Sequence, residues 1–131
     1  MIVVDASVLA NVVGDDGADG QRVRGELRAA DGLAAPDLVD VETMAVLRKR
    51  WIAGSMTDGR FAAAVEDLGA LEVDRYPALR FLRRVFELRA NVTAYDAVYV
   101  ALAEALGCEL WTADRRLASA PGTACAFRVL R

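Results

Sequence analysis

Apolar positions along the chain fall into short continuous runs separated by longer segments of helical spacing. The run Ile2-Val3-Val4 stops at Asp5, and a β-branched run of this kind is typical of a strand buried on both faces. The same pattern predicts strands over residues 32–36, 71–73, 109–112 and 126–130. Asp5 is therefore expected at the carboxyl end of the first strand.

Apolar residues three and four positions apart predict helices between these strands. The expected helices cover residues 18–30, 38–53, a segment after Thr57, 77–90 and 93–106, with a short turn over 8–13 and a short helix from Asp114. Asp37 can cap the helix over 38–53, and Pro77 suits a first helical turn. Thr93 and Gly107 bound the most strongly amphipathic of these helices.

Strands and helices alternate along the whole chain, which predicts an α/β sandwich around a central, mostly parallel sheet. The 131 residues fit one domain, residues 1–131, and the chain shows no internal repeat or linker. No apolar run approaches the roughly 20 residues of a membrane span. The amino terminus also lacks the basic segment of a signal peptide. We therefore expect a cytoplasmic protein with no membrane partner.

Composition limits the chemistry that is available to the chain. It contains no histidine, which excludes Ser-His-Asp, Cys-His and histidine-based ribonuclease catalysis. Cys108 and Cys125 make no zinc site without histidine and are expected as small buried hydrophobes in a reducing cytosol. The net charge of −3 argues against nucleic-acid binding by bulk charge, so such binding needs a local cluster of arginines. An enzyme of this composition depends on carboxylates and a cation.

Two acidic residues directly follow predicted strands. Asp5 follows the first strand and Asp114 follows the strand over 109–112. Ligand sites of open α/β sheets lie outside the carboxyl ends of the strands, which makes both residues candidates for a site. Each also has a structural alternative as the N-cap of the helix that comes next. Ser7 can serve as that cap in place of Asp5.

Glu42 lies on the helix predicted over 38–53, among Leu38, Val41, Ala45 and Val46 at helical spacing. A carboxylate within such an apolar stripe is costly to bury unless it is paired or bound to a cation. The alternative is that Glu42 lies at the edge of the stripe, where it reaches water or pairs with arginine.

Asp96 follows Thr93 by three positions, in a pattern that resembles a capping box and gives Asp96 a structural alternative. It also lies in the first turn of the most amphipathic helix, beside Tyr95 and ahead of Tyr99. If the four acidic residues converge, their mutual repulsion favours a bound divalent cation or the uptake of protons. Ligation by oxygen alone suits Mg²⁺ or Mn²⁺, which supports phosphodiester hydrolysis without histidine.

Four short segments of the chain carry a resemblance to a known family. They are IVVDAS at 2–7, PDLVDVE at 36–42, YDAVYVALA at 95–103 and WTAD at 111–114. In this order, in a chain of this size, they resemble the VapC-type toxins of the PIN-domain family. The resemblance implies a PIN-like α/β/α sandwich with metal-binding carboxylates and supporting hydroxyls. The carboxylates would be Asp5, Glu42, Asp96 and Asp114, and the hydroxyls Thr112 and Ser7.

The resemblance also implies an activity and partners. The activity is that of an Mg²⁺- or Mn²⁺-dependent endoribonuclease acting as the toxin of a type II toxin–antitoxin pair. The partners are an RNA substrate, a VapB-type antitoxin whose tail occupies the active-site groove, and a second copy of the chain in a homodimer. Basic residues are candidate contacts to the RNA backbone, with a solvated helix face as the alternative for each. They are Arg48, Lys49, Arg50, Arg80, Arg83, Arg84 and Arg89.

Two other functions compete with this interpretation. A phosphatase with Asp5 as its nucleophile would resemble the haloacid-dehalogenase pattern, which needs a second aspartate two residues later, where this chain has Ser7. The other is a catalytically silent PIN-like module that binds RNA or protein without cutting. The presence of all four carboxylates counts against a silent module.

Overall fold

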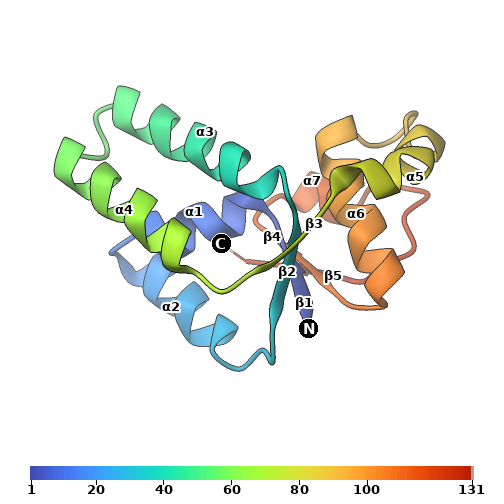
Figure 1. The fold of residues 1–131 in the computed structure, drawn as a ribbon, viewed down its shortest axis with the longest axis horizontal. Helices are drawn as coiled ribbons and strands as arrows, with labels where there is room; N and C mark the ends of the chain where they lie inside the picture. The colour runs from blue at the N-terminus through green and yellow to red at the C-terminus, as the bar shows by residue number, and fades with distance from the viewer. Residues whose placement is uncertain (131) are drawn as a thin grey trace.

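The computed structural model describes residues 1–130, which form a five-stranded sheet with helices on both faces (Figure 1). The strands are β1 Ile2–Val4, β2 Leu33–Pro36, β3 Asp74–Tyr76, β4 Leu110–Thr112 and β5 Phe127–Val129. Their order across the sheet is β3-β2-β1-β4-β5, and every neighbouring pair is parallel. The predicted α/β sandwich with a parallel sheet is confirmed.

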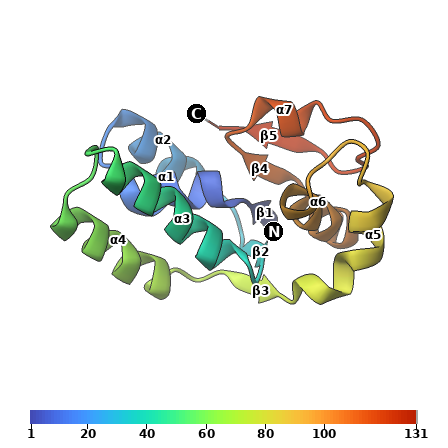
Figure 2. The ribbon, with the colours of Figure 1, turned by 90° about the horizontal axis from the view of Figure 1, so that it is seen from above.

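Helices cover both faces of this sheet. Those described are α1 Ala6–Gly14, α2 Ala18–Leu27, α3 Val39–Ile52, α4 Asp58–Ala70, the 3₁₀ turn η1 Ala78–Phe81, α5 Leu82–Glu87, α6 Ala94–Leu106 and α7 Arg115–Ala118. Figure 2 shows the strands in a row from β5 to β3, with α1 to α4 on one side and α5 and α6 on the other. No helix within residues 1–130 has both the length and the apolar character needed to cross a membrane.

The core lies around β1, because this strand is covered on both faces as its apolar run predicts. Val3 and Val4 are fully buried, and α6 packs against β1, β2 and β4 from one side. The helix α6 forms where its spacing predicts it. Thr93 caps its first turn by accepting a hydrogen bond from the Asp96 amide at 3.3 Å, and Gly107 ends it with φ +65°.

The sheet changes its winding direction between β1 and β4. From β1 the chain adds β2 and β3 on one side, and it then crosses to the other side to add β4 and β5. The register pairs Val4 with Trp111, and the Asp5 amide donates to the Trp111 carbonyl at 3.2 Å. A crevice at the carboxyl ends of two such strands is where open α/β sheets bind ligands. The fold therefore places the end of β1 and the end of β4 at one site.

Three predicted elements differ from the structure. The turn expected over 8–13 is the nine-residue helix α1, and the strand expected over 71–73 lies at 74–76, where Ala34 and Asp74 are in register. The helix expected over 77–90 is instead the 3₁₀ turn η1 followed by the six-residue helix α5. Pro77 has an extended ψ of 124°, so it precedes the turn instead of lying within it. The position of β3 follows from its pairing with β2, which apolar spacing does not encode.

The start of α3 also differs from its prediction. Asp37 does not cap this helix, whose N-cap is Leu38 without a side-chain bond. The Asp37 carboxylate instead accepts the Ala78 amide at 3.1 Å, across 41 residues of sequence. The expected apolar stripe was also misplaced, since Val41 is 74% exposed. The buried face of α3 instead carries Val39, Thr43 and Leu47, so it is rotated from the face that the spacing predicted.

Candidate active site

Asp5 lies at the carboxyl end of β1 and forms the N-cap of α1. Its Oδ1 accepts hydrogen bonds from the Val8 amide at 3.1 Å and from the Ser7 hydroxyl at 2.5 Å. Only 6% of the residue is exposed, and burial raises the pKa of the Asp5 carboxyl above its usual range. Asp5 therefore does serve as the helix cap, the role that the sequence analysis gave as its alternative, and Ser7 does not. The burial of this capped carboxylate opposes its ionised form.

Two hydroxyls tie the end of β4 to Asp5. The Ser7 hydroxyl accepts a hydrogen bond from the Ala113 amide at 3.0 Å, across 106 residues of sequence. Thr112 is fully buried, accepts the Asp114 amide at 3.0 Å and also hydrogen-bonds the Asp5 carboxyl, which lowers its pKa. These bonds fix the orientation of the carboxylates at the ends of the two strands.

Glu42 enters the site from α3 and is held by a residue to which the sequence assigned no role. The Tyr99 hydroxyl donates to Glu42 Oε1 at 2.7 Å, and Tyr99 is only 1% exposed. Glu42 is half-buried, and its pKa is raised by desolvation and by the charges of Asp96 and Asp5. Glu42 thus lies at the edge of the buried face of α3, as the alternative interpretation held, and it faces α6 instead of open water.

Asp96 and Asp114 complete the group on the other side. Asp96 is half-buried in the first turn of α6, and desolvation followed by the charge of Asp114 raises its pKa. Asp114 is exposed and caps α7, because its Oδ1 accepts the Arg116 amide at 2.8 Å. Asp114 therefore caps α7, as the structural alternative predicted, and it also lies near Asp96.

The four carboxylates are electrostatically linked through Asp96, whose charge raises the pKa of Asp5 and Glu42 and is itself influenced by Asp114. Within residues 1–130, however, no three acidic, cysteine or histidine side chains lie close enough together to form a ready-made metal cage. The donor set still fits a hard cation. Mg²⁺ is commonly held by one or two carboxylates with waters and substrate phosphates completing its shell, and a buried carboxylate with a raised pKa favours a nearby positive charge.

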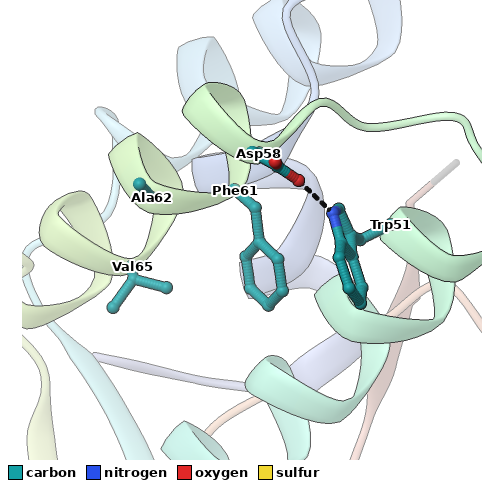
Figure 3. A pocket seen from close by; sticks show the side chains of 5 residues that line it. All are labelled: Trp51, Asp58, Phe61, Ala62 and Val65. Carbon is teal, nitrogen blue, oxygen red and sulfur yellow. Dashed lines mark hydrogen bonds between the residues drawn. The ribbon is translucent and has the colours of Figure 1, made fainter.

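An apolar pocket of about 310 Å³ lies elsewhere, between the end of α3 and the start of α4 (Figure 3). Its walls are Trp51, Phe61, Ala62 and Val65, and its one carboxylate, Asp58, accepts the Trp51 indole N–H at 2.6 Å. This arrangement uses the only charged group of the pocket for a structural bond.

The basic residues proposed as RNA contacts divide into two groups. Arg50 donates to Ala10 and Asn11, Arg84 pairs with Glu104, and the Arg89 guanidinium stacks on Phe86. These three are held by the fold. The remaining candidates make no hydrogen bond or ion pair through their side chains within the described part of the chain, and they stay available to a ligand. They are Arg48, Lys49, Arg80 and Arg83.

Comparison with known proteins gives consistent results. A family model described as the PIN domain matches residues 2–122. A VapC ribonuclease of Mycobacterium bovis is 43% identical over 133 residues, covering 99% of this chain and 98% of the relative. The ribonuclease VapC1 of Mycobacterium tuberculosis is 38% identical, covering 98% of this chain and 97% of its own length.

Solved structures show the same fold. The chain aligns with VapC20 of Mycobacterium tuberculosis, described as a Sarcin-Ricin loop cleaving toxin, with a TM-score of 0.72 at 16% identity, covering 95% of this chain and 97% of that one. It also aligns with a chain of the VapBC2 complex of Rickettsia felis, which was solved with a DNA fragment from the promoter of the two proteins. The TM-score is 0.70 at 13% identity, and the alignment covers 100% of both chains.

Proposed function

The chain belongs to the PIN-domain family, in its VapC branch, and from this membership we propose that it is an endoribonuclease acting as the toxin of a toxin–antitoxin pair. The observation that carries the proposal is the group of four mutually influencing carboxylates at the point where the sheet changes its winding direction. The full-length relatives named ribonucleases support the substrate class.

The proposed reaction is hydrolysis of an RNA phosphodiester bond with Mg²⁺ or Mn²⁺. Asp5, Glu42, Asp96 and Asp114 would hold the cation, which when bound polarises the phosphate and lowers the pKa of a water. The chain's own groups have defined tasks. Thr112 and Ser7 fix the orientation of Asp5, and the hydroxyl of Tyr99 fixes that of Glu42. Because the chain has no histidine, proton transfer in this reaction depends on the carboxylates and water.

The proposed partners follow from the same branch of the family. The solved VapBC2 complex supports a VapB-type antitoxin as the protein partner. An antitoxin arginine would match the four carboxylates by charge. A homodimer is also proposed, and the exposed side chains of Leu79, Leu82 and Phe86 on η1 and α5 support it, since exposed apolar patches commonly mark protein interfaces.

A silent binding module is the second candidate function. It is favoured by one observation, which is that no three carboxylates of residues 1–130 form a ready-made metal cage. The raised pKa values of Asp5, Glu42 and Asp96 count against it, because a fold without use for these charges would replace them at little cost.

Incubation of total bacterial RNA with antitoxin-free protein tests the proposal. Discrete fragments are expected with Mg²⁺ or Mn²⁺ and not with EDTA, and an Asp5→Asn, Asp96→Asn double variant should give none. A Glu66→Gln, Asp67→Asn double variant on the exposed face of α4 is the matched control and should cut like the wild type. RNA binding without cleavage by folded wild-type protein, under every divalent metal, would establish the silent module.

Expression in a bacterial host tests the toxin assignment separately. The wild-type chain without an antitoxin is expected to slow growth, and the Asp5→Asn, Asp96→Asn variant should not. Normal growth at high soluble expression, together with cleavage in vitro, would leave a nuclease that is not a toxin.

A further inference from the structure

A cavity of about 270 Å³ adjoins the carboxylates on the side of Asp96 and Asp114. Two distant segments form it, one being the loop and first turn that lead into α6, and the other the connection from β4 into α7. Asn91 and Thr93 line it from the first segment, and Arg116 lines it from the second. The cavity thus combines two carboxylates with an arginine and an amide, which is a mixed lining that suits a polar, charged ligand.

The guanidinium of Arg116 is uncommitted although it borders this cavity. The backbone amide of Arg116 donates to Asp114, but its side chain makes no hydrogen bond, ion pair or ring contact within residues 1–130. Several other arginines of the chain are held by carboxylates. Arg75 makes two bonds to Asp40, at 2.7 and 2.9 Å, and Arg60 makes two to Asp16, at 2.6 and 3.0 Å. An exposed arginine beside two carboxylates that it does not pair with remains free to bind an anion.

We propose that Arg116 binds an RNA phosphate next to the one that is cleaved, and that the cavity holds the nucleotide carrying it. This inference rests on the proposed ribonuclease function. A guanidinium matches a phosphate with two parallel hydrogen bonds, which an ammonium does not. It also offsets the repulsion that an RNA strand meets near the carboxylates.

The size and position of the cavity indicate where along the RNA the bound nucleotide lies relative to the cleaved bond. At about 270 Å³ the cavity is small, since small-molecule pockets usually measure roughly 300–1,000 Å³, and it therefore has room for no more than one nucleotide. It is lined by Asp96 and Asp114 but not by Asp5 or Glu42, so it lies to one side of the carboxylate group. Its phosphate is accordingly a binding contact beside the reacting bond. The side chain of Asn91 has no hydrogen-bond partner in the described chain and offers its amide to the sugar or base.

The experiment measures binding of a fluorescein-labelled, ten-nucleotide, mixed-sequence single-stranded RNA over a range of salt concentrations. An Asp5→Asn background prevents cleavage during the titration. Into it are introduced Arg116→Gln, and separately Arg115→Gln, which removes the same charge from an exposed neighbour outside the cavity. Arg116→Lys keeps the charge and loses the two-pronged geometry. Thermal unfolding should be unchanged in all three, because neither arginine side chain has an intramolecular partner in the described residues.

Arg116→Gln is expected to weaken RNA binding about tenfold, the effect of one lost charge-assisted hydrogen-bond pair. It should also reduce the slope of log affinity against log salt by about 0.7, the value for one phosphate contact to a single strand. Arg116→Lys should recover the slope but only part of the affinity, while Arg115→Gln changes both much less.

Equal effects of Arg116→Gln and Arg115→Gln, or no effect of the former, would overturn the inference. Cleavage of total RNA by the wild type would then still support the proposed function. A wild-type chain that neither binds nor cleaves RNA would overturn both.

Discussion

Replacement of Asp5 by asparagine is expected to stabilise the metal-free protein while it abolishes RNA cleavage. Asp5 is 6% exposed, and burial raises its pKa, so its ionised form is destabilising in the folded state at neutral pH. Asparagine has nearly the same shape and caps helices as well as aspartate does. Its Oδ1 can accept the same bonds from the Val8 amide and the Ser7 hydroxyl.

The size of this effect follows from what the substitution removes and keeps. It removes the desolvation of one charge and the repulsion from Asp96, while the capping bond is kept. Relief of this kind at functional sites typically adds about 0.5–2 kcal/mol to the free energy of unfolding. For a domain of this size, each ~1 kcal/mol raises Tm by roughly 3–6 °C.

A bound cation should reverse the order of the two proteins. A ligand present at 100 times its Kd stabilises the folded state by about 2.7 kcal/mol, and only the wild type retains the charge of Asp5. Urea unfolding followed by circular dichroism measures the stability of both proteins without the cation, in EDTA, and with it, in saturating Mn²⁺. Asp67→Asn on the exposed face of α4 is the control and should match the wild type in both buffers. An Asp5→Asn protein that is less stable than the wild type in EDTA would refute the reasoning.

Three further substitutions test single contacts. Tyr99→Phe removes the hydroxyl that holds Glu42 and should slow RNA cleavage roughly three- to tenfold, with the fold retained by circular dichroism. Thr43→Val replaces a fully buried hydroxyl that has no partner in the described chain, and urea titration should show about 1 kcal/mol more stability, whereas a loss would reveal a missed bond. Glu104→Gln breaks the 2.7 Å pair with Arg84 and should cost about 1 kcal/mol at pH 7. Because Arg84 lowers the pKa of Glu104 below 4.5, this cost is fully present above pH 4.5, and unfolding curves should show it vanish as pH falls through the folded pKa.

The amino-acid sequence was sufficient for the elements whose signals are local. The apolar run before Asp5 predicts β1, and Thr93 and Gly107 predict both ends of α6, because capping and left-handed termination involve residues within one turn. The edge strand β3 was displaced from its prediction, since its position depends on pairing with β2. The cap assigned to Asp37 failed for the same reason, because its partner is the amide of Ala78.

The composition of the site could also be named from the sequence, but its arrangement could not. Asp5 was named from its place after the first strand and Thr112 from the family resemblance, whereas the adjacency of β1 and β4 that brings them together is a property of the sheet order. The bond between Ser7 and the Ala113 amide, and that between Tyr99 and Glu42, join residues 106 and 57 positions apart. Local spacing encodes which face of an element is apolar, since burial and backbone bonding repeat with its period. Which polar groups meet across elements is decided only when the whole chain packs, because each buried donor and acceptor then takes the partner that the completed fold leaves within reach.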